Sequence, residues 1–189
     1  MKAKVLSAND IRCALASLSS GRHVDRDRVI VLLSFKAGMR ACEISGLTWA
    51  MVTNGRGGIS GHIEITAEIS KYGSARRIPL NPELKRALVV LAKTSGGCSG
   101  PVVRSERGGH MTAKSIVNWF ARLYDDLGLE GCSSHSGRRT FVTRAARLIA
   151  KSGGSLRDLQ QLVGHRSITT TQRYIDGDSD AQRRLIRLL

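Results

Sequence analysis

The sequence predicts an α+β domain that is mostly α-helical, with one small antiparallel β-sheet. Apolar residues recur at helical spacing along most of the 189 residues, and the alternation typical of strands occurs only between positions 59 and 80. Hydrophobic residues make up 41% of the chain and prolines number only 3, which favours a globular fold over a disordered one. The length suits one domain with a substantial core.

The chain begins with three expected helices. Ser7 is a good N-cap, and Asp10 lies three residues later, where a carboxylate complements the helix dipole. Gly21 ends this first pattern. The apolar segment 29–35 predicts a buried helix, and the segment 41–47 predicts a short one.

The predicted sheet is a single hairpin. In the segment 59–65 isoleucines alternate with polar residues, which is strand periodicity. The segment 71–74 predicts a turn, and the segment 76–80 predicts the returning strand.

The rest of the chain is predicted to be helical. The sequence Asn81-Pro82-Glu83 opens a helix, because asparagine caps, proline fits the first helical position and glutamate favours the dipole. Further helices are expected at 112–127, after His135, and at 155–163, 167–175 and 180–189.

The chain is strongly basic. Lysine and arginine number 30 against 15 aspartates and glutamates, so the formal net charge is +15. Such a surplus favours nucleic acid as a partner, because basic side chains displace its condensed counterions. The longest apolar stretch is far shorter than the ~20 residues that span a bilayer, and no signal peptide is apparent, so no membrane association is expected.

The cysteines do not predict a metal site. Cys13, Cys42, Cys98 and Cys132 are scattered, and the pair formed by Cys132 and His135 has no second pair at ligand spacing. Reduced thiols in a cytoplasmic protein are expected.

Residues suited to phosphate chemistry occur in three segments. Arg40 follows a glycine turn at the start of a short helix, and His135 and Arg138 would share one helix face. His165 lies after a predicted helix end, with Tyr174 nine residues later. Taken singly, each is a weak signal. A lone arginine in a basic protein is usually a solvated or phosphate-positioning residue, a lone histidine near a helix start is usually a cap or core residue, and a lone tyrosine usually serves packing.

Together and in this order, these residues resemble the active site of the tyrosine recombinases, the family of phage integrases and site-specific resolvases. The segment A-G-M-R-A-C-E-I-S-G-L resembles the first arginine box, H-S-G-R-R-T-F-V-T the H-x-x-R box, and L-V-G-H-R-S-I-T-T-T-Q-R-Y the nucleophile box. The resemblance covers Leu6 to Tyr174. It implies the catalytic set Arg40, Lys71, His135, Arg138, His165 and Tyr174.

The chemistry of strand cleavage suits these residue types. Attack on a phosphodiester places extra negative charge on nonbridging oxygens, which Arg40 and Arg138 can clamp and His165 can hydrogen-bond. A tyrosine hydroxyl has a pKa near ~10 and needs a base or a cationic pocket, and the resemblance implies His135 as that base. Lys71, on the hairpin turn, is the expected general acid for the leaving 5′ oxygen.

Some assignments leave alternatives. Arg76 and Arg77 share the hairpin with Lys71, although the S-K-Y-G turn favours the lysine. Glu43 is expected to support the site by orienting a histidine or arginine, and it is nearly as well explained as a helix-start carboxylate. Contacts with DNA are expected from Arg76, Arg77, Arg139, Arg166 and Arg173.

The sequence also departs from the family pattern. Gly137 stands where an apolar residue is common and Arg139 where histidine is common. By helix propensity alone, Gly137 costs up to about 1 kcal/mol relative to alanine.

The implied function is a site-specific recombinase or integrase of double-stranded DNA, acting through a 3′-phosphotyrosine intermediate. No carboxylate cluster is needed, so neither metal nor cofactor is expected. The alternatives are a type IB topoisomerase-like activity, against which the G-H-R-S box argues, and a catalytically idle DNA-binding remnant or regulator from a mobile element. The complete set of six residues argues against an idle remnant, and the expected absence of the N-terminal DNA-gripping domain argues for one.

The expected organisation is a catalytic domain over residues 1–189 with a tail helix at 176–189. The N-terminal core-binding domain usual in the family is expected to be absent. The chain is then either a shortened form of a longer enzyme or a naturally short enzyme like the fimbrial inversion recombinases. The protein is expected to be a monomer when free and a homotetramer on DNA, with an accessory DNA-bending protein as a possible partner. The expected location is the cytoplasm, in a bacterial or phage-type setting. The apolar tail would pack on a neighbouring protomer or on its own domain through Leu185, Ile186, Leu188 and Leu189.

Overall fold

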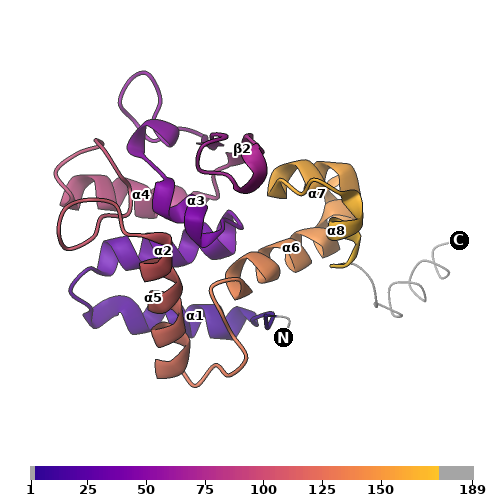
Figure 1. Ribbon diagram of the computed structural model, residues 1–189, viewed down its shortest axis with the longest axis horizontal. Helices are drawn as coiled ribbons and strands as arrows, with labels where there is room; N and C mark the ends of the chain where they lie inside the picture. The colour runs from indigo at the N-terminus through magenta and orange to yellow at the C-terminus, as the bar shows by residue number, and fades with distance from the viewer. Residues whose placement is uncertain (1–2, 175–189) are drawn as a thin grey trace, which may run out of the picture. The chain divides into compact units, whose positions relative to one another are not determined.

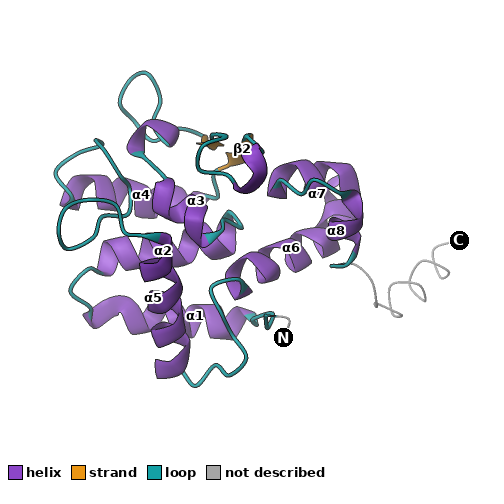
Figure 2. Cartoon of the chain, viewed as in Figure 1, coloured by secondary structure: helices purple, strands orange, loops and turns teal. Residues whose placement is uncertain are grey.

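The computed structural model describes residues 3–174. The chain divides into two compact units, Met1–Phe141 and Val142–Leu189. Helices dominate both, and the strands of the described part form one two-stranded sheet (Figure 2). This confirms the predicted fold class. The tail helix predicted at 176–189 lies outside the described residues.

The first two helices follow local capping and burial. α1 (Ala8–Ser17) begins with a reciprocal cap: the Ser7 hydroxyl accepts from the Asp10 N–H at 3.1 Å, and the Asp10 carboxylate accepts from the Ser7 N–H at 2.8 Å. α2 (Val24–Lys36) starts earlier than predicted. Its first turn is only half-buried and largely polar, so the apolar run 29–35 marks only the fully buried part.

Three more helices complete the packing of the first unit. α3 (Ala41–Gly46) is short, α4 (Pro82–Thr94) is capped by Asn81, and α5 (Ala113–Asp126) is capped by Thr112. α2 packs against α4 and α3 packs against α5 (Figure 1). The core of this unit includes the fully buried side chains of Ile30, Leu32, Leu33, Ile44, Trp49 and Phe120.

The hairpin is shorter than the sequence pattern predicted. β1 (His62–Ile65) pairs antiparallel with β2 (Arg76–Pro79), and the ladder ends at the pair formed by Ile65 and Arg76. The isoleucine at position 59 forms only an isolated bridge with Thr53. Single-turn 3₁₀ helices also occur, at Leu18–Ser20, Trp49–Met51, Lys71–Gly73 and Ala150–Ser152.

α6 (Ser136–Ile149) begins in the first unit and continues into the second. In the second unit, α7 (Leu156–Val163) packs against α8 (Ile168–Gln172). α7 ends at Gly164, whose φ of 66° lies in the left-handed region that glycine adopts without a steric penalty. In the part of the chain that the structure describes, no helix is long and apolar enough to cross a bilayer.

Candidate active site

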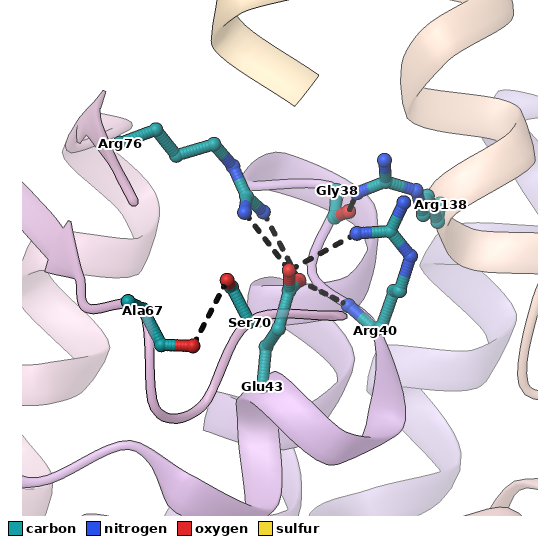
Figure 3. A network of polar contacts seen from close by, with 7 residues as sticks. All are labelled: Gly38, Arg40, Glu43, Ala67, Ser70, Arg76 and Arg138. Carbon is teal, nitrogen blue, oxygen red and sulfur yellow. Dashed lines mark hydrogen bonds and ion pairs between the residues drawn. The ribbon is translucent and has the colours of Figure 1, made fainter. Parts of the chain in front are cut away.

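A buried carboxylate organises two arginines of the first unit. Glu43, in α3, is fully buried. Its Oε1 accepts from Arg40 Nη1 at 3.1 Å and Arg76 Nη1 at 2.9 Å, and its Oε2 accepts from the Arg40 backbone N–H at 2.8 Å and Arg76 Nη2 at 3.0 Å (Figure 3). Each carboxylate oxygen therefore receives one hydrogen bond from each arginine.

The environment of Glu43 keeps it ionised. Burial by itself raises the pKa of this carboxyl. The hydrogen bonds and charge of Arg76, the backbone N–H of Arg40 and the charge of Arg138 outweigh that effect, and the pKa of Glu43 is held below its ordinary value of 4.5. The result is a charged carboxylate that fixes the neighbouring guanidinium groups.

Arg138 is anchored at the turn that leads into Arg40. Arg138 is only 5% exposed, and its Nη1 donates to the carbonyl oxygen of Gly38 at 2.7 Å. Gly38 has a φ of 63°, and an added β-carbon there would lie 2.4 Å from Cδ1 of Phe141. This turn therefore requires glycine, and it packs against the first part of α6. Figure 3 shows Arg138 bonded to the carbonyl of Gly38 and Arg40 bonded to Glu43.

The other predicted residues of the first unit differ in exposure. Lys71 lies in the exposed turn of the loop between β1 and β2, and His135 lies exposed just before α6. Arg77 is 67% exposed and pairs with Glu64 at 3.3 Å. The Arg76 side chain, by contrast, is only 5% exposed. The structure thus gives Arg76 a partner within the protein, while a contact of Arg76 with DNA stays a prediction.

The second unit brings together the two predicted residues of the nucleophile box. The rings of His165 and Tyr174 stack with centroids 5.9 Å apart and an interplanar angle of 19°. His165 Nδ1 shares a hydrogen bond of 3.0 Å with the hydroxyl of the buried Thr171. Gln160 Nε2 donates to the carbonyl of His165 at 2.9 Å, which fixes the turn before α8. Of the remaining predicted DNA contacts, Arg166 and Arg173 are exposed and Arg139 is half-buried.

Sequence reasoning missed three supporting residues: the partner role of Arg76, the Thr171 hydroxyl and the Gln160 amide. A signal for Arg76 was present. Arg76 and Ile78 lie two residues apart on β2 and therefore on one face, and Ile78 is buried. No comparable local pattern marks Gln160 or Thr171.

Among residues 3–174, no group of three or more histidine, cysteine, aspartate or glutamate side chains lies close enough together to hold a metal ion.

The comparison with known families identifies the chain. The model of the phage integrase family matches residues 4–180. The chain belongs to this family. It is 29% identical over 152 residues to tyrosine recombinase XerC of Pelobacter propionicus, covering 79% of this chain and 47% of that protein. It is also 29% identical over 151 residues to XerC of Xylella fastidiosa, covering 79% and 48%. This phage integrase family chain thus spans about half the length of these relatives.

Solved structures of recombinases share the fold of this phage integrase family chain. The XerA recombinase superposes with a TM-score of 0.76 at 22% identity, covering 100% of this chain and 65% of that one. The Tn1549 transposon integrase in complex with transposon right end DNA gives 0.76 at 20% identity, covering 100% and 67%. A lambda integrase dimer bound to a core site gives 0.71 at 21% identity, covering 93% and 49%.

Proposed function

We propose that this chain is the catalytic domain of a site-specific recombinase, which cleaves and rejoins double-stranded DNA through a 3′-phosphotyrosine intermediate. The observation that carries the proposal is the anchoring of Arg40 and Arg138 at one turn. Glu43 holds the first guanidinium and the carbonyl of Gly38 holds the second. Membership of the phage integrase family supports the same conclusion.

The charges around Glu43 suit a phosphate. Arg40, Arg76 and Arg138 carry three positive charges against the single negative charge of the carboxylate, so the cluster keeps a positive excess. Guanidinium groups stay charged at any working pH and match phosphate oxygens in pairs. Because protein contacts fix them in advance, Arg40 and Arg138 stabilise the charge of the transition state without reorganising.

The reaction uses the side chains in distinct roles. The Tyr174 oxygen attacks the phosphorus, a tyrosine O–P bond forms, and the bond to the 5′ oxygen breaks. His135 takes the tyrosine proton, Lys71 gives a proton to the leaving 5′ oxygen, and His165 donates a hydrogen bond to a nonbridging oxygen. Attack by a 5′ hydroxyl of a partner strand reverses these steps. The phosphotyrosine bond conserves the energy, so neither ATP nor a metal ion is required.

The assembly belongs to the same proposal. Strand exchange needs four strands cut in a coordinated way. We therefore propose that the protein is a monomer when free and forms a homotetramer on DNA, in the cytoplasm of a bacterium. An accessory DNA-bending protein can join this assembly. Deletion of residues 180–189 tests the tail. Single-strand cleavage with loss of complete recombination supports docking on a neighbouring protomer, whereas an unfolded monomer contradicts it.

The decisive experiment captures the covalent intermediate. The full chain is incubated with a randomised library of nicked DNA duplexes. When the protein cuts near the nick, the short fragment that carries the 5′ hydroxyl diffuses away and the strand cannot be rejoined. Covalent adducts are separated on denaturing gels, and their DNA is sequenced. Wild type should accumulate adducts, and Tyr174→Phe should form none while retaining its fold and DNA affinity. Tyr124→Phe is the matched control, because Tyr124 is buried in α5 and belongs to none of the three motifs. Adducts of Tyr174→Phe at wild-type levels would remove Tyr174 as the nucleophile.

A further inference from the structure

The loop that carries Lys71 is bonded to α3 at its C-terminal end, where Arg76 pairs with Glu43. The ladder of β1 and β2 ends at the pair of Ile65 and Arg76, and residues 66–75 form the loop beyond it. From this last pair, Arg76 donates both terminal nitrogens to Glu43 at 2.9 and 3.0 Å. An arginine with a side chain only 5% exposed is uncommon and is normally paired in this way.

The same helix holds the loop at a second place. An added β-carbon on Gly46 would lie 2.5 Å from Cγ2 of Ile69, so the Ile69 side chain packs directly on the backbone of α3. The next residue, Ser70, is buried, and its hydroxyl donates to the carbonyl of Ala67 at 3.3 Å (Figure 3). α3 therefore restrains the loop at two places: at its end, through Arg76, and two residues before Lys71, through Ile69.

Arg40 depends on the same carboxylate. It lies directly before α3, and Glu43 accepts from both its backbone N–H and its guanidinium. A change at Arg76 therefore acts first on the loop of Lys71, which loses its bond to Glu43. Arg40 keeps its two hydrogen bonds with the same carboxylate.

We propose that Arg76 is a positioning residue for strand cleavage, which through Glu43 sets the loop of Lys71 relative to Arg40. This inference rests on the proposed recombinase function. It gives Arg76 a role inside the protein that differs from the DNA contact predicted from the sequence. The step most sensitive to Arg76 is the protonation of the leaving 5′ oxygen, because Lys71 depends on the loop for its place.

A change of leaving atom isolates that step. In an ordinary strand, the bond between phosphorus and the 5′ oxygen breaks as Lys71 supplies a proton. When sulfur replaces this bridging oxygen, the leaving group is a thiolate, which is a far weaker base than an alkoxide and needs no proton. A defect confined to general-acid catalysis therefore disappears on the sulfur substrate.

The test measures the rate of adduct formation on matched oxygen and sulfur substrates. Arg76→Gln should slow cleavage of the oxygen substrate about tenfold to a hundredfold, and the sulfur substrate should restore most of the loss. Lys71→Ala should show the same pattern, and Arg40→Gln should be slow on both substrates. Arg28→Gln is the control, because Arg28 pairs with Glu83 at 3.4 Å on the surface, and it should change neither rate.

Two further variants keep the inference testable if Arg76→Gln does not fold. Gly46→Ala displaces Ile69 while leaving the ion pair intact, and it should also lose rate on the oxygen substrate alone. Arg76→Lys keeps the positive charge but cannot make the bidentate contact with Glu43, so it should lose an intermediate part of the cleavage rate on the oxygen substrate. Equal losses on both substrates, or no loss on either, would overturn the positioning role. A wild-type protein that forms adducts on neither substrate would overturn the proposed function itself.

Discussion

Gly137 of α6 lies so close to Ser34 of α2 that a β-carbon added to the glycine would come within 2.0 Å of the serine Oγ. Both residues are buried. The serine Cβ would lie at 2.9 Å, so a different rotamer of Ser34 does not remove the clash. Close packing of two helices, and not helix propensity, therefore decides the residue at this position.

Gly137→Ala should destabilise the protein, although alanine is the better helix former. Overpacking of this kind costs about 1–3 kcal/mol, more than the propensity gain of about 1 kcal/mol. Denaturant unfolding measures the difference. Ser34→Gly should rescue most of the loss in Gly137→Ala, because it removes the two atoms that lie within 2.9 Å of the new methyl group and leaves only Cδ2 of Phe35 at 3.3 Å. A stabilised Gly137→Ala variant would contradict the packing.

Acid should weaken the fold through Glu43. Its pKa is lowered in the folded state, so the stabilisation it provides is fully present above its ordinary value of 4.5 and is lost as the pH falls below that value through the folded pKa. Glu43→Gln should cost about 3–5 kcal/mol near neutral pH, because it leaves buried arginines without their carboxylate. The difference from wild type should shrink below about pH 4.5. An unchanged difference at low pH would show that Glu43 does not titrate as argued.

Thr171→Val should slow cleavage without unfolding the second unit. The Thr171 hydroxyl is the partner of His165 Nδ1 at 3.0 Å, and valine keeps the shape of the side chain while removing that partner. A misoriented histidine should lower the adduct rate about tenfold or more. Thr170→Val is the matched control, because Thr170 is exposed on the same short helix. Equal rates for the two variants would remove Thr171 from the positioning of His165.

DNA affinity should fall steeply with salt. A protein that contacts 6–10 phosphates loses about 10³–10⁵ in affinity between about 50 and 200 mM salt. Arg173→Gln should weaken binding to all duplexes alike and reduce the salt slope by about 1, since Arg173 is exposed and predicted to contact DNA. Arg12→Gln, on the exposed face of α1, should leave the slope unchanged. A salt-insensitive complex would contradict binding through phosphates.

The sequence by itself determined the features that depend on near neighbours. The cap formed by Ser7 and Asp10, the start of α4 at Asn81 and the end of α7 at Gly164 all follow from contacts within a few residues. The ordered motifs around Arg40 and Tyr174 likewise indicated the family that the comparison confirms.

Only the tertiary structure decided how distant side chains are used. Arg76 and Glu43 are 33 positions apart, and Arg138 and Gly38 are 100 apart, so no local period relates them. Gly137 is unfavourable in an isolated helix and necessary where α6 meets Ser34. Propensity and spacing act within one helix or strand, whereas burial, charge pairing and steric fit depend on which elements the folded chain brings into contact.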